Sequence, residues 1–207
     1  GWHDWYLAAN LGTERLQDHL FNGIEPTGVP RALEGTALPF AYGDADMLAD
    51  LLRRHAGQVA CIIMEPMRSE APPPGFLEAV RQLANEHGVI LIFDEVSCGF
   101  RVALGGAQEY TGVTPDMSVF AKAISNGYPM AAVVGRKDIM AAVERMFVSS
   151  AYWDDCIGIV AALTTLRELE RRDAVAHFAK IGSLLKSGIN QAAQDVGLEA
   201  ECVGVAA

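Results

Sequence analysis

Short, mostly apolar segments that alternate with helical patterns constrain the fold of this chain most. Strands are predicted at residues 59–64, 89–93, 117–121 and 131–134, because runs of this length bounded by turn signals are typical of buried strands. Continuous apolar runs also indicate strands covered on both faces. Helical patterns lie between and after these runs. The sequence therefore predicts an α/β fold, a mostly parallel sheet with helices on both faces.

The helical patterns have recognisable ends. Asp44 is placed to cap a helix over residues 45–55 that Gly57 ends. Pro74 and Gly75 precede a second helix, whose apolar residues share one face until Gly88 closes it. Further helices are predicted at 137–145, 157–171 and 174–195, and the last two are expected to be packing elements.

Composition excludes several classes of protein. The net charge of −10 argues against a nucleic-acid surface, which needs a basic patch. No apolar run approaches the ~20 residues needed to cross a bilayer, and no signal peptide is visible. The four cysteines, Cys61, Cys98, Cys156 and Cys202, are far apart and are expected to be buried free thiols. No metal site is predicted, and the expected location is the cytoplasm.

Two charged residues follow predicted strands. Asp94 comes directly after the apolar residues 90–93, and Lys122 comes after 117–121. Ligands of parallel sheets bind at the carboxyl ends of strands, where both residues fall. Small and apolar neighbours predict a partly dry pocket around Lys122, followed by a tight turn at 125–127.

An acid and an amine at neighbouring strand ends are the pair that a pyridoxal phosphate (PLP) site requires. The amine of Lys122 would form a Schiff base with the cofactor and then move a proton. The carboxylate of Asp94 would keep the pyridine nitrogen protonated. Val96, on the same face of the strand as Asp94, is expected to support the ring, whereas Glu95 points to the opposite face and is expected to make a structural hydrogen bond.

A set of short motifs in a fixed order carries a family resemblance over nearly the entire chain. These motifs are Gly-Val-Pro at 28–30, Glu-Pro at 65–66, Phe-Asp-Glu-Val at 93–96, Gly-Phe-Arg-Val at 99–102, Gly-Gly-Ala-Gln at 105–108, Val-Thr-Pro-Asp at 113–116, Ala-Lys-Ala at 121–123 and Asn-Gly-Tyr-Pro at 126–129. Together they resemble the class III PLP-dependent aminotransferases of fold type I. The nearest branch is similar to glutamate-1-semialdehyde aminomutase and its relatives.

The resemblance implies roles for individual residues. Lys122 matches the Schiff-base lysine, Asp94 the partner of the pyridine nitrogen and Val96 the residue packed on the ring. Family members bind the phosphate with a threonine of the partner subunit, but the matching position here is Ala151. Ser150 is the candidate replacement.

Glu70 is a second departure that bears on the substrate. Many class III transaminases have glutamate at this position, whereas the aminomutase pattern has asparagine. Glu70 therefore favours a transaminase and a role in substrate binding, while the long loop of residues 1–43 resembles the aminomutase side. Surface exposure is the alternative for Glu70.

The resemblance also implies a domain organisation. Residues 1–43 would form an active-site loop region, 44–150 the PLP-binding α/β core of an aspartate-aminotransferase-like large domain, and 151–207 a helical segment leading towards a C-terminal small domain. The chain opens without methionine and stops without a terminal helix pattern, so we expect it to be the middle of a longer protein, incomplete at both ends. By itself it is expected to show little or no turnover.

The implied function is amino-group transfer between an amino acid, amine or amino sugar and an oxo acid or aldehyde, in a homodimer with shared active sites. An intramolecular aminomutase is the alternative within the same chemistry. A catalytically silent structural or interaction domain is the alternative from another class. A nucleotide-binding domain is disfavoured because no phosphate-binding glycine motif follows any strand.

Overall fold

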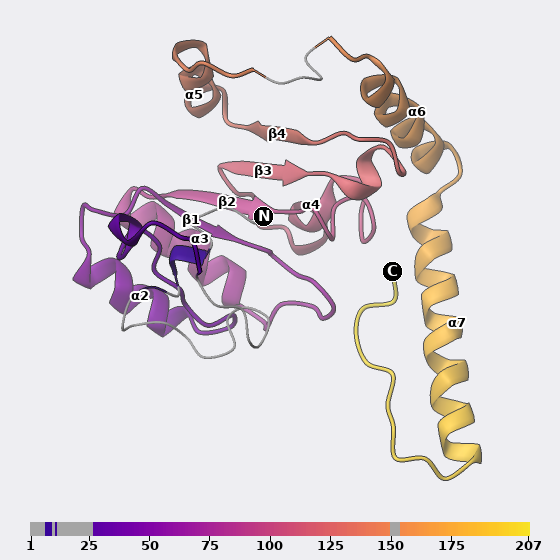
Figure 1. Cartoon of the computed structure of the whole chain (residues 1–207). Coiled ribbons are helices and arrows are strands. Elements are labelled where there is room, and N and C mark those ends of the chain that lie inside the picture. The colour runs from indigo at the N-terminus through magenta and orange to yellow at the C-terminus, as the bar shows by residue number, and fades with distance from the viewer. Residues whose placement is uncertain (1–6, 10, 12–26, 150–153) are drawn as a thin grey trace. The chain divides into compact units, whose positions relative to one another are not determined.

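The computed structural model of the chain describes residues 7–9, 11, 27–149 and 154–207 (Figure 1). The chain divides into two compact units, residues 1–59 and residues 60–207. In the first unit a 3₁₀ turn, Arg31–Leu33, precedes helix α2, Ala45–Arg54.

The predicted cap of α2 is confirmed. The Asp44 side chain accepts a hydrogen bond from the Met47 N–H at 2.8 Å, which satisfies an otherwise unpaired donor of the first turn. The helix ends at Arg54, one residue earlier than predicted, and Gly57 follows with a φ of +71°. The apolar stripe of α2 is formed by three buried leucines at helical spacing, Leu48, Leu51 and Leu52.

The second unit contains a sheet of four strands in the order β1-β2-β3-β4. Their bounds are Cys61–Met64 for β1, Ile90–Asp94 for β2, Met117–Phe120 for β3 and Ala132–Gly135 for β4. β1 pairs with β2 and β2 with β3 in parallel, whereas β4 runs antiparallel to β3. The prediction of a mostly parallel sheet with helices is confirmed.

Two helices connect the parallel strands. Helix α3, Phe76–His87, lies between β1 and β2 in the chain, and helix α4, Gly106–Thr111, lies between β2 and β3. The inward stripe of α3 is fully buried, and the helix packs against β2. As predicted, Gly88 ends α3, with the left-handed φ of +65° that glycine adopts without strain.

The expected coverage of the strands on both faces is not met by β1. Ile62 is buried, but its neighbour Ile63 is 59% exposed. Successive side chains of a strand point to opposite faces, and the buried face is the one that carries Leu91 and Phe93 of β2.

The C-terminal half of the second unit is helical but more exposed than predicted. The helix expected at 137–145 is an α-helix, Lys137–Met140 (α5), continued by a 3₁₀ segment, Ala141–Arg145. Helices α6, Ile157–Arg171, and α7, Ala174–Asp195, have the predicted bounds.

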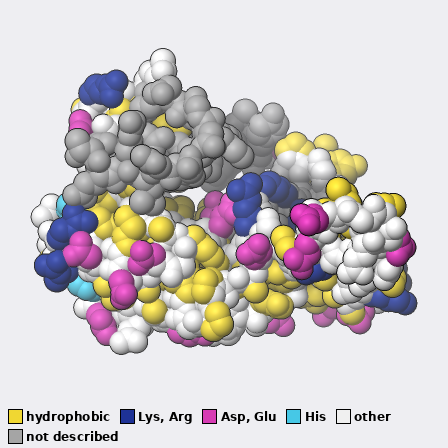
Figure 2. Space-filling model, turned by 90° about the horizontal axis from the view of Figure 1, so that it is seen from below, with side chains coloured by type: hydrophobic (Ala, Val, Ile, Leu, Met, Phe, Trp, Pro, Cys, Tyr) yellow, Lys and Arg dark blue, Asp and Glu magenta, His cyan; other side chains and the backbone are white. Residues whose placement is uncertain are grey.

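The prediction that α6 and α7 are packing elements is met only in part: Ala162 of α6 packs with Phe120 and Ile124, but most apolar residues of the two helices are exposed. Val160 of α6 and Leu184 and Leu185 of α7 are each 60–61% exposed. Only Gly158 and Ala162 of α6 and Ala193 of α7 are buried. Apolar side chains also reach the surface elsewhere on the face shown in Figure 2.

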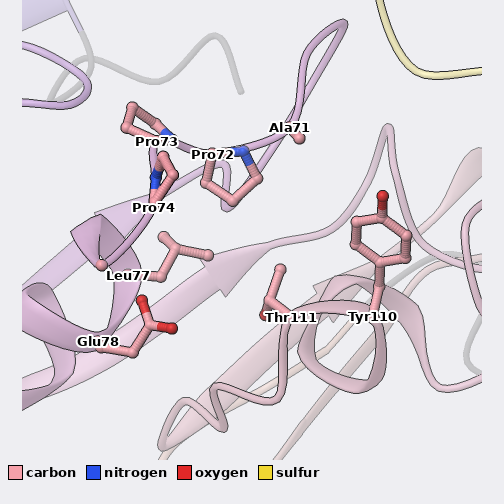
Figure 3. A pocket seen from close by; sticks show the side chains of 9 residues that line it. Ala71, Pro72, Pro73, Pro74, Leu77, Glu78, Tyr110 and Thr111 are labelled. Carbon is pink, nitrogen blue, oxygen red and sulfur yellow. The ribbon is translucent and has the colours of Figure 1, made fainter.

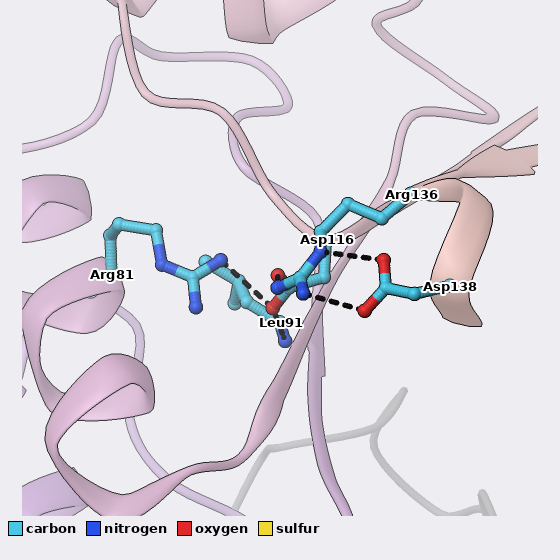
Figure 4. A network of polar contacts seen from close by, with 5 residues as sticks. All are labelled: Arg81, Leu91, Asp116, Arg136 and Asp138. Carbon is cyan, nitrogen blue, oxygen red and sulfur yellow. Dashed lines mark hydrogen bonds and ion pairs between the residues drawn. The ribbon is translucent and has the colours of Figure 1, made fainter.

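A buried carboxylate ties the sheet to two arginines (Figure 4). The Asp116 side chain, 7% exposed, accepts hydrogen bonds from the Leu91 N–H of β2 at 2.8 Å, from Arg81 of α3 at 2.9 Å and from Arg136 at 2.9 Å. Burial opposes ionisation of this group, but the three hydrogen bonds outweigh it and hold the pKa of Asp116 below its usual value. Asp116 therefore joins α3, β2 and the end of β4.

A second buried carboxylate holds the loop after β2. Glu95 is fully buried and accepts hydrogen bonds from the Ala107 N–H and from the Gln108 side chain, so its predicted structural hydrogen bond is confirmed. Burial raises its pKa, although these hydrogen bonds oppose the shift. Gly106 has a φ of +76°, and a Cβ there would collide with the Glu95 carboxylate.

Replacement of Asp116 by alanine should lower the free energy of unfolding by about 3–5 kcal/mol, because it leaves the largely buried Arg81 guanidinium and the buried Leu91 N–H without their acceptor. The measurement is urea denaturation of both proteins. Asp138→Ala is the control: its carboxylate pairs with the same Arg136 but is 64% exposed, and its loss should cost less than about 1 kcal/mol. Equal losses of stability in the two variants would contradict a special structural role for the buried Asp116 carboxylate.

The contribution of Asp116 should depend on pH with a definite sign. Because its pKa is lowered by folding, the stabilisation is complete above the unfolded-chain value of about 3.9 and is lost as pH falls through the folded value. The difference in unfolding free energy between wild type and Asp116→Ala should therefore be constant near neutrality and shrink below about pH 4.

Gly106→Ala and Gly112→Ala form a matched pair, since both glycines have a φ of +76° but only Gly106 faces a neighbouring side chain. Gly112→Ala should cost about 1–2 kcal/mol for the left-handed backbone. Gly106→Ala should cost a further ~1–3 kcal/mol for displacing Glu95. Thermal or urea unfolding measures the difference, and equal costs would show that Glu95 yields without strain.

Candidate active site

Asp94 is the last residue of β2 and lies where the sequence predicts it. Its side chain is half-buried, and its Oδ1 accepts a hydrogen bond from the Val96 N–H at 3.0 Å. This short turn fixes the carboxylate at the carboxyl end of the strand. Asp94 also pairs in register with Val119 of β3, so the ends of the two strands lie side by side.

Lys122 begins a 3₁₀ turn, Lys122–Ile124, two residues after the end of β3. Its φ of +46° is uncommon for a residue with a side chain and carries backbone strain. The turn predicted after it is present: Asn126 and Gly127 both have positive φ, and the Tyr128 N–H donates to the Ser125 carbonyl.

The prediction of a partly dry pocket around Lys122 is wrong for this chain. The lysine is exposed, although Ile124 and Ser125 just after it are buried. The small and apolar residues near Lys122 therefore shape the backbone of the turn rather than cover the amine.

Ser97 accepts hydrogen bonds from two cationic side chains, those of Lys122 and Arg101. Its hydroxyl accepts a hydrogen bond from the Lys122 Nζ at 2.8 Å, across 25 residues of sequence. Its carbonyl accepts a second bond from the Arg101 Nε at 2.7 Å. Ser97 lies three residues after Asp94, so the turn that holds the carboxylate also directs the amine.

The loop after β2 is shaped by close packing. A Cβ at Gly99 would lie 2.7 Å from both the Glu95 carbonyl oxygen and the Phe120 ring, so only glycine fits there. The next residue, Phe100, has a φ of +64°, and its ring centroid lies 5.0 Å from that of Phe120. These contacts bring the Gly-Phe-Arg motif against the end of β3, next to Lys122.

Of the other predicted site residues, the structure describes Val96 and Glu70 but not Ser150. Val96 is half-buried in the turn beside Asp94, and Glu70 is exposed in the loop that follows β1. Both belong to the carboxyl edge of the sheet. Ser150, the candidate phosphate ligand, and its neighbour Ala151 lie outside the described residues.

The cysteines differ from expectation in their exposure. All four are free, but only Cys98 is buried, whereas Cys61 and Cys156 are exposed. Burial, together with the negative charge of Glu95, raises the pKa of Cys98 to about 12, so this thiol stays protonated at neutral pH. Among the described residues no cluster of His, Cys, Asp or Glu could hold a metal ion.

Two pockets lie in the second unit. One has a volume of about 190 Å³, with the prolines of residues 72–74 on one side and Tyr110 and Thr111 on the other (Figure 3). Its lining includes neither Asp94 nor Lys122. The other has a volume of about 300 Å³ and is lined in part by Arg101 and by Ser97, the residue whose hydroxyl accepts the hydrogen bond from Lys122. No helix in the described part of the chain is long and apolar enough to span a membrane.

The donor set at this edge fits PLP. A half-buried carboxylate from β2 and an amine from the turn after β3 are the two groups that its pyridine nitrogen and aldehyde need. Asp94, Val96 and Lys122 would hold the ring end of the cofactor. None of these three residues is assigned to the phosphate group of the cofactor.

Sequence reasoning missed two residues of the site. Ser97 and Arg101 lie in the loop after β2, one before and one within the Gly-Phe-Arg motif. Their polar character in an otherwise apolar loop is a signal, but the partner of Ser97 is 25 residues away. Only the pairing of β2 with β3 brings Ser97 and Lys122 together.

Comparison with known proteins places the chain in a family. Residues 41–200 match the model for class III aminotransferases. The chain is 36% identical to a 3-aminobutyryl-CoA aminotransferase of Cloacimonas acidaminovorans (strain Evry), over 99% of its own length and 47% of that protein.

Solved structures agree. The FumI protein of Sphingopyxis sp. MTA144, in its PLP internal aldimine form, is 29% identical with a TM-score of 0.82, over 86% of this chain and 45% of that one. An omega-transaminase from Sphaerobacter thermophilus is 25% identical with a TM-score of 0.85, over 100% of this chain and 49% of that one. The chain thus spans about half the length of these relatives. With the family model matched over most of its residues, the chain belongs to the class III aminotransferases, with the fold of the type I PLP enzymes.

Proposed function

We propose that the protein carries out PLP-dependent amino-group transfer between an amino acid, amine or amino sugar and an oxo acid or aldehyde. One observation carries the proposal: Asp94 ends β2 opposite Val119 of β3, and Lys122, which follows β3, donates from its Nζ to the Ser97 hydroxyl at 2.8 Å. Membership of the class III aminotransferases supports it.

Each residue has a distinct role in this proposal. The Lys122 Nζ would hold the cofactor through its aldehyde and, as a free amine, would carry a proton to and from the reacting carbon of the substrate. The Asp94 carboxylate keeps a proton on the pyridine nitrogen. When bound, PLP supplies an electron sink for the carbanion formed at the substrate carbon. Val96 supports the ring, and Ser150 contacts the phosphate.

The substrate is proposed only as a class. The relatives include an enzyme named for 3-aminobutyryl-CoA and an omega-transaminase, and in the first name the amino group is on carbon 3. We therefore propose that the accepted amino group need not be next to a carboxylate. Glu70, exposed at the same edge as Lys122, contributes to this choice.

The remaining expectations stay proposals. We propose a homodimer with shared sites, and little or no turnover from these 207 residues alone. The glutamate-1-semialdehyde aminomutase alternative predicts an amine shift without a second substrate, so a requirement for an oxo acid or aldehyde acceptor would argue against it. A silent domain would bind PLP, if at all, without a preferred lysine.

Covalent trapping tests the proposed role of Lys122 without requiring turnover. The purified protein is incubated with PLP and reduced with borohydride, and the labelled peptide is identified by mass spectrometry. We expect the label on the peptide that contains Lys122, because its backbone and Ser97 hold the amine at the carboxyl edge of the sheet. Lys122→Ala should abolish this label.

Lys137→Ala is the matched control. Lys137 is also exposed, but it begins α5, away from the turn after β3. Its loss should leave labelling at Lys122 unchanged. Equal labelling of Lys122, Lys137, Lys180 and Lys186 would be nonspecific and would contradict the proposed function.

A further inference from the structure

The pocket next to Lys122 is formed by three separate segments of the second unit. Residues 68–69 follow β1, residues 97–102 follow β2, and residues 203–207 follow α7. Together they enclose about 300 Å³, enough space for a small organic acid. Two of the three walls come from the carboxyl edge of the parallel sheet, the edge on which such folds bind ligands.

The third wall is held in place by specific contacts. The Val205 N–H donates to the Ser69 carbonyl at 2.8 Å, and the Lys186 Nζ of α7 donates to the Gly204 carbonyl at 2.8 Å. Gly204 has a φ of +104°, and a Cβ there would lie 2.7 Å from the Ser69 carbonyl oxygen. The segment after α7 therefore approaches the segment after β1 so closely that only glycine fits at residue 204.

The charged side chains of the lining are both positive. Arg68 and Arg101 contribute guanidinium groups, Ser69 and Ser97 contribute hydroxyls, and the lining contains no Asp or Glu side chain within the described ranges. The bond from the Arg101 Nε to Ser97 uses one of the five N–H donors of its guanidinium. Arg68 is paired loosely with Glu65, at 3.8 Å. These donors suit a carboxylate, which arginine binds with two parallel hydrogen bonds.

Ser97 belongs both to this pocket and to the contact with Lys122. Its hydroxyl accepts the hydrogen bond from Nζ while its residue lines the pocket. An anion bound to Arg101 would therefore lie one side chain away from the reactive amine. That separation suits a substrate whose carboxylate is anchored while its amino or oxo carbon reaches Lys122.

We infer that the pocket lined by Arg68, Ser69, Ser97 and Arg101 binds the carboxylate of the amino acid or oxo acid substrate. This inference rests on the proposed function and names a substrate subsite for it. Arg101 provides the main anchor because its guanidinium is fixed by Ser97. Arg68 adds a second, more mobile charge, since its side chain is 67% exposed.

Succinate is the probe, because it carries carboxylates but no amino or oxo group. Its binding to the purified, PLP-loaded protein is measured by calorimetry or by NMR titration. We expect saturable binding that Arg101→Gln weakens roughly tenfold or more, the loss typical of a charge-assisted hydrogen bond. Arg68→Gln should weaken binding by a smaller factor. Arg167→Gln, on the exposed surface of α6, should leave it unchanged.

The source of the bound anion is tested with the same samples. The phosphate of PLP is the other anion that these arginines could accept. If succinate binds only the PLP-free protein and inorganic phosphate displaces it, the pocket holds the cofactor's phosphate and the inference is overturned. Binding that persists after PLP loading supports a substrate subsite.

Failure of this inference is distinguishable from failure of the proposed function. Borohydride trapping at Lys122 is carried out on every arginine variant. Trapping at Lys122 with succinate binding that is unaffected by Arg101→Gln would overturn the subsite alone. Absence of specific trapping in the wild-type protein would overturn the proposed function, whatever the succinate titration shows.

Discussion

Parallel pairing of β2 with β3 is the constraint on which the site depends. The hydrogen bonds of this pairing place Asp94 opposite Val119 and bring the Glu95 N–H to the Val119 carbonyl at 2.9 Å. Because parallel strands end at the same edge, the loop after β2 and the turn after β3 must share that edge. Ser97 and Lys122 meet there for this reason. The chemistry of the site thus follows from backbone geometry before any cofactor is considered.

Two buried carboxylates support this edge from different directions. Asp116 ties β2 to α3 and to the end of β4 through arginine partners, and folding keeps it ionised. Glu95 instead serves as an acceptor for the backbone of α4, and burial favours its protonated form. In the described part of the chain, the hydrogen bonds of these two carboxylates do not involve the side chains of Asp94 or Lys122. They hold the loop and the strands in register, the rigid support that a binding or catalytic site requires.

Strain and exposure are concentrated at the same edge. Of the four residues other than glycine with positive φ in the described part of the chain, Phe100, Lys122 and Asn126 lie here and Asp173 lies between α6 and α7; such backbone strain is often found at functional positions. The exposed Lys122 and the pocket lined in part by Arg68 and Arg101 lie at this edge, where we propose that a cofactor and an acidic substrate bind. Apolar residues of α6 and α7 remain exposed in this chain, which spans about half the length of its relatives.

The sequence by itself determined the order and the bounds of most elements, and it predicted that Asp94 and Lys122 follow neighbouring strands, where the structure has them. Local signals carried that information: the Asp44 cap, the terminal Gly88 and the apolar runs each act within a few residues. Only the tertiary structure decided that β4 runs antiparallel, that Ile63 and Lys122 are exposed, and that Ser97, Arg68 and Arg101 gather beside the amine. These outcomes depend on contacts between residues far apart in the chain, and no local pattern encodes which distant partners will meet.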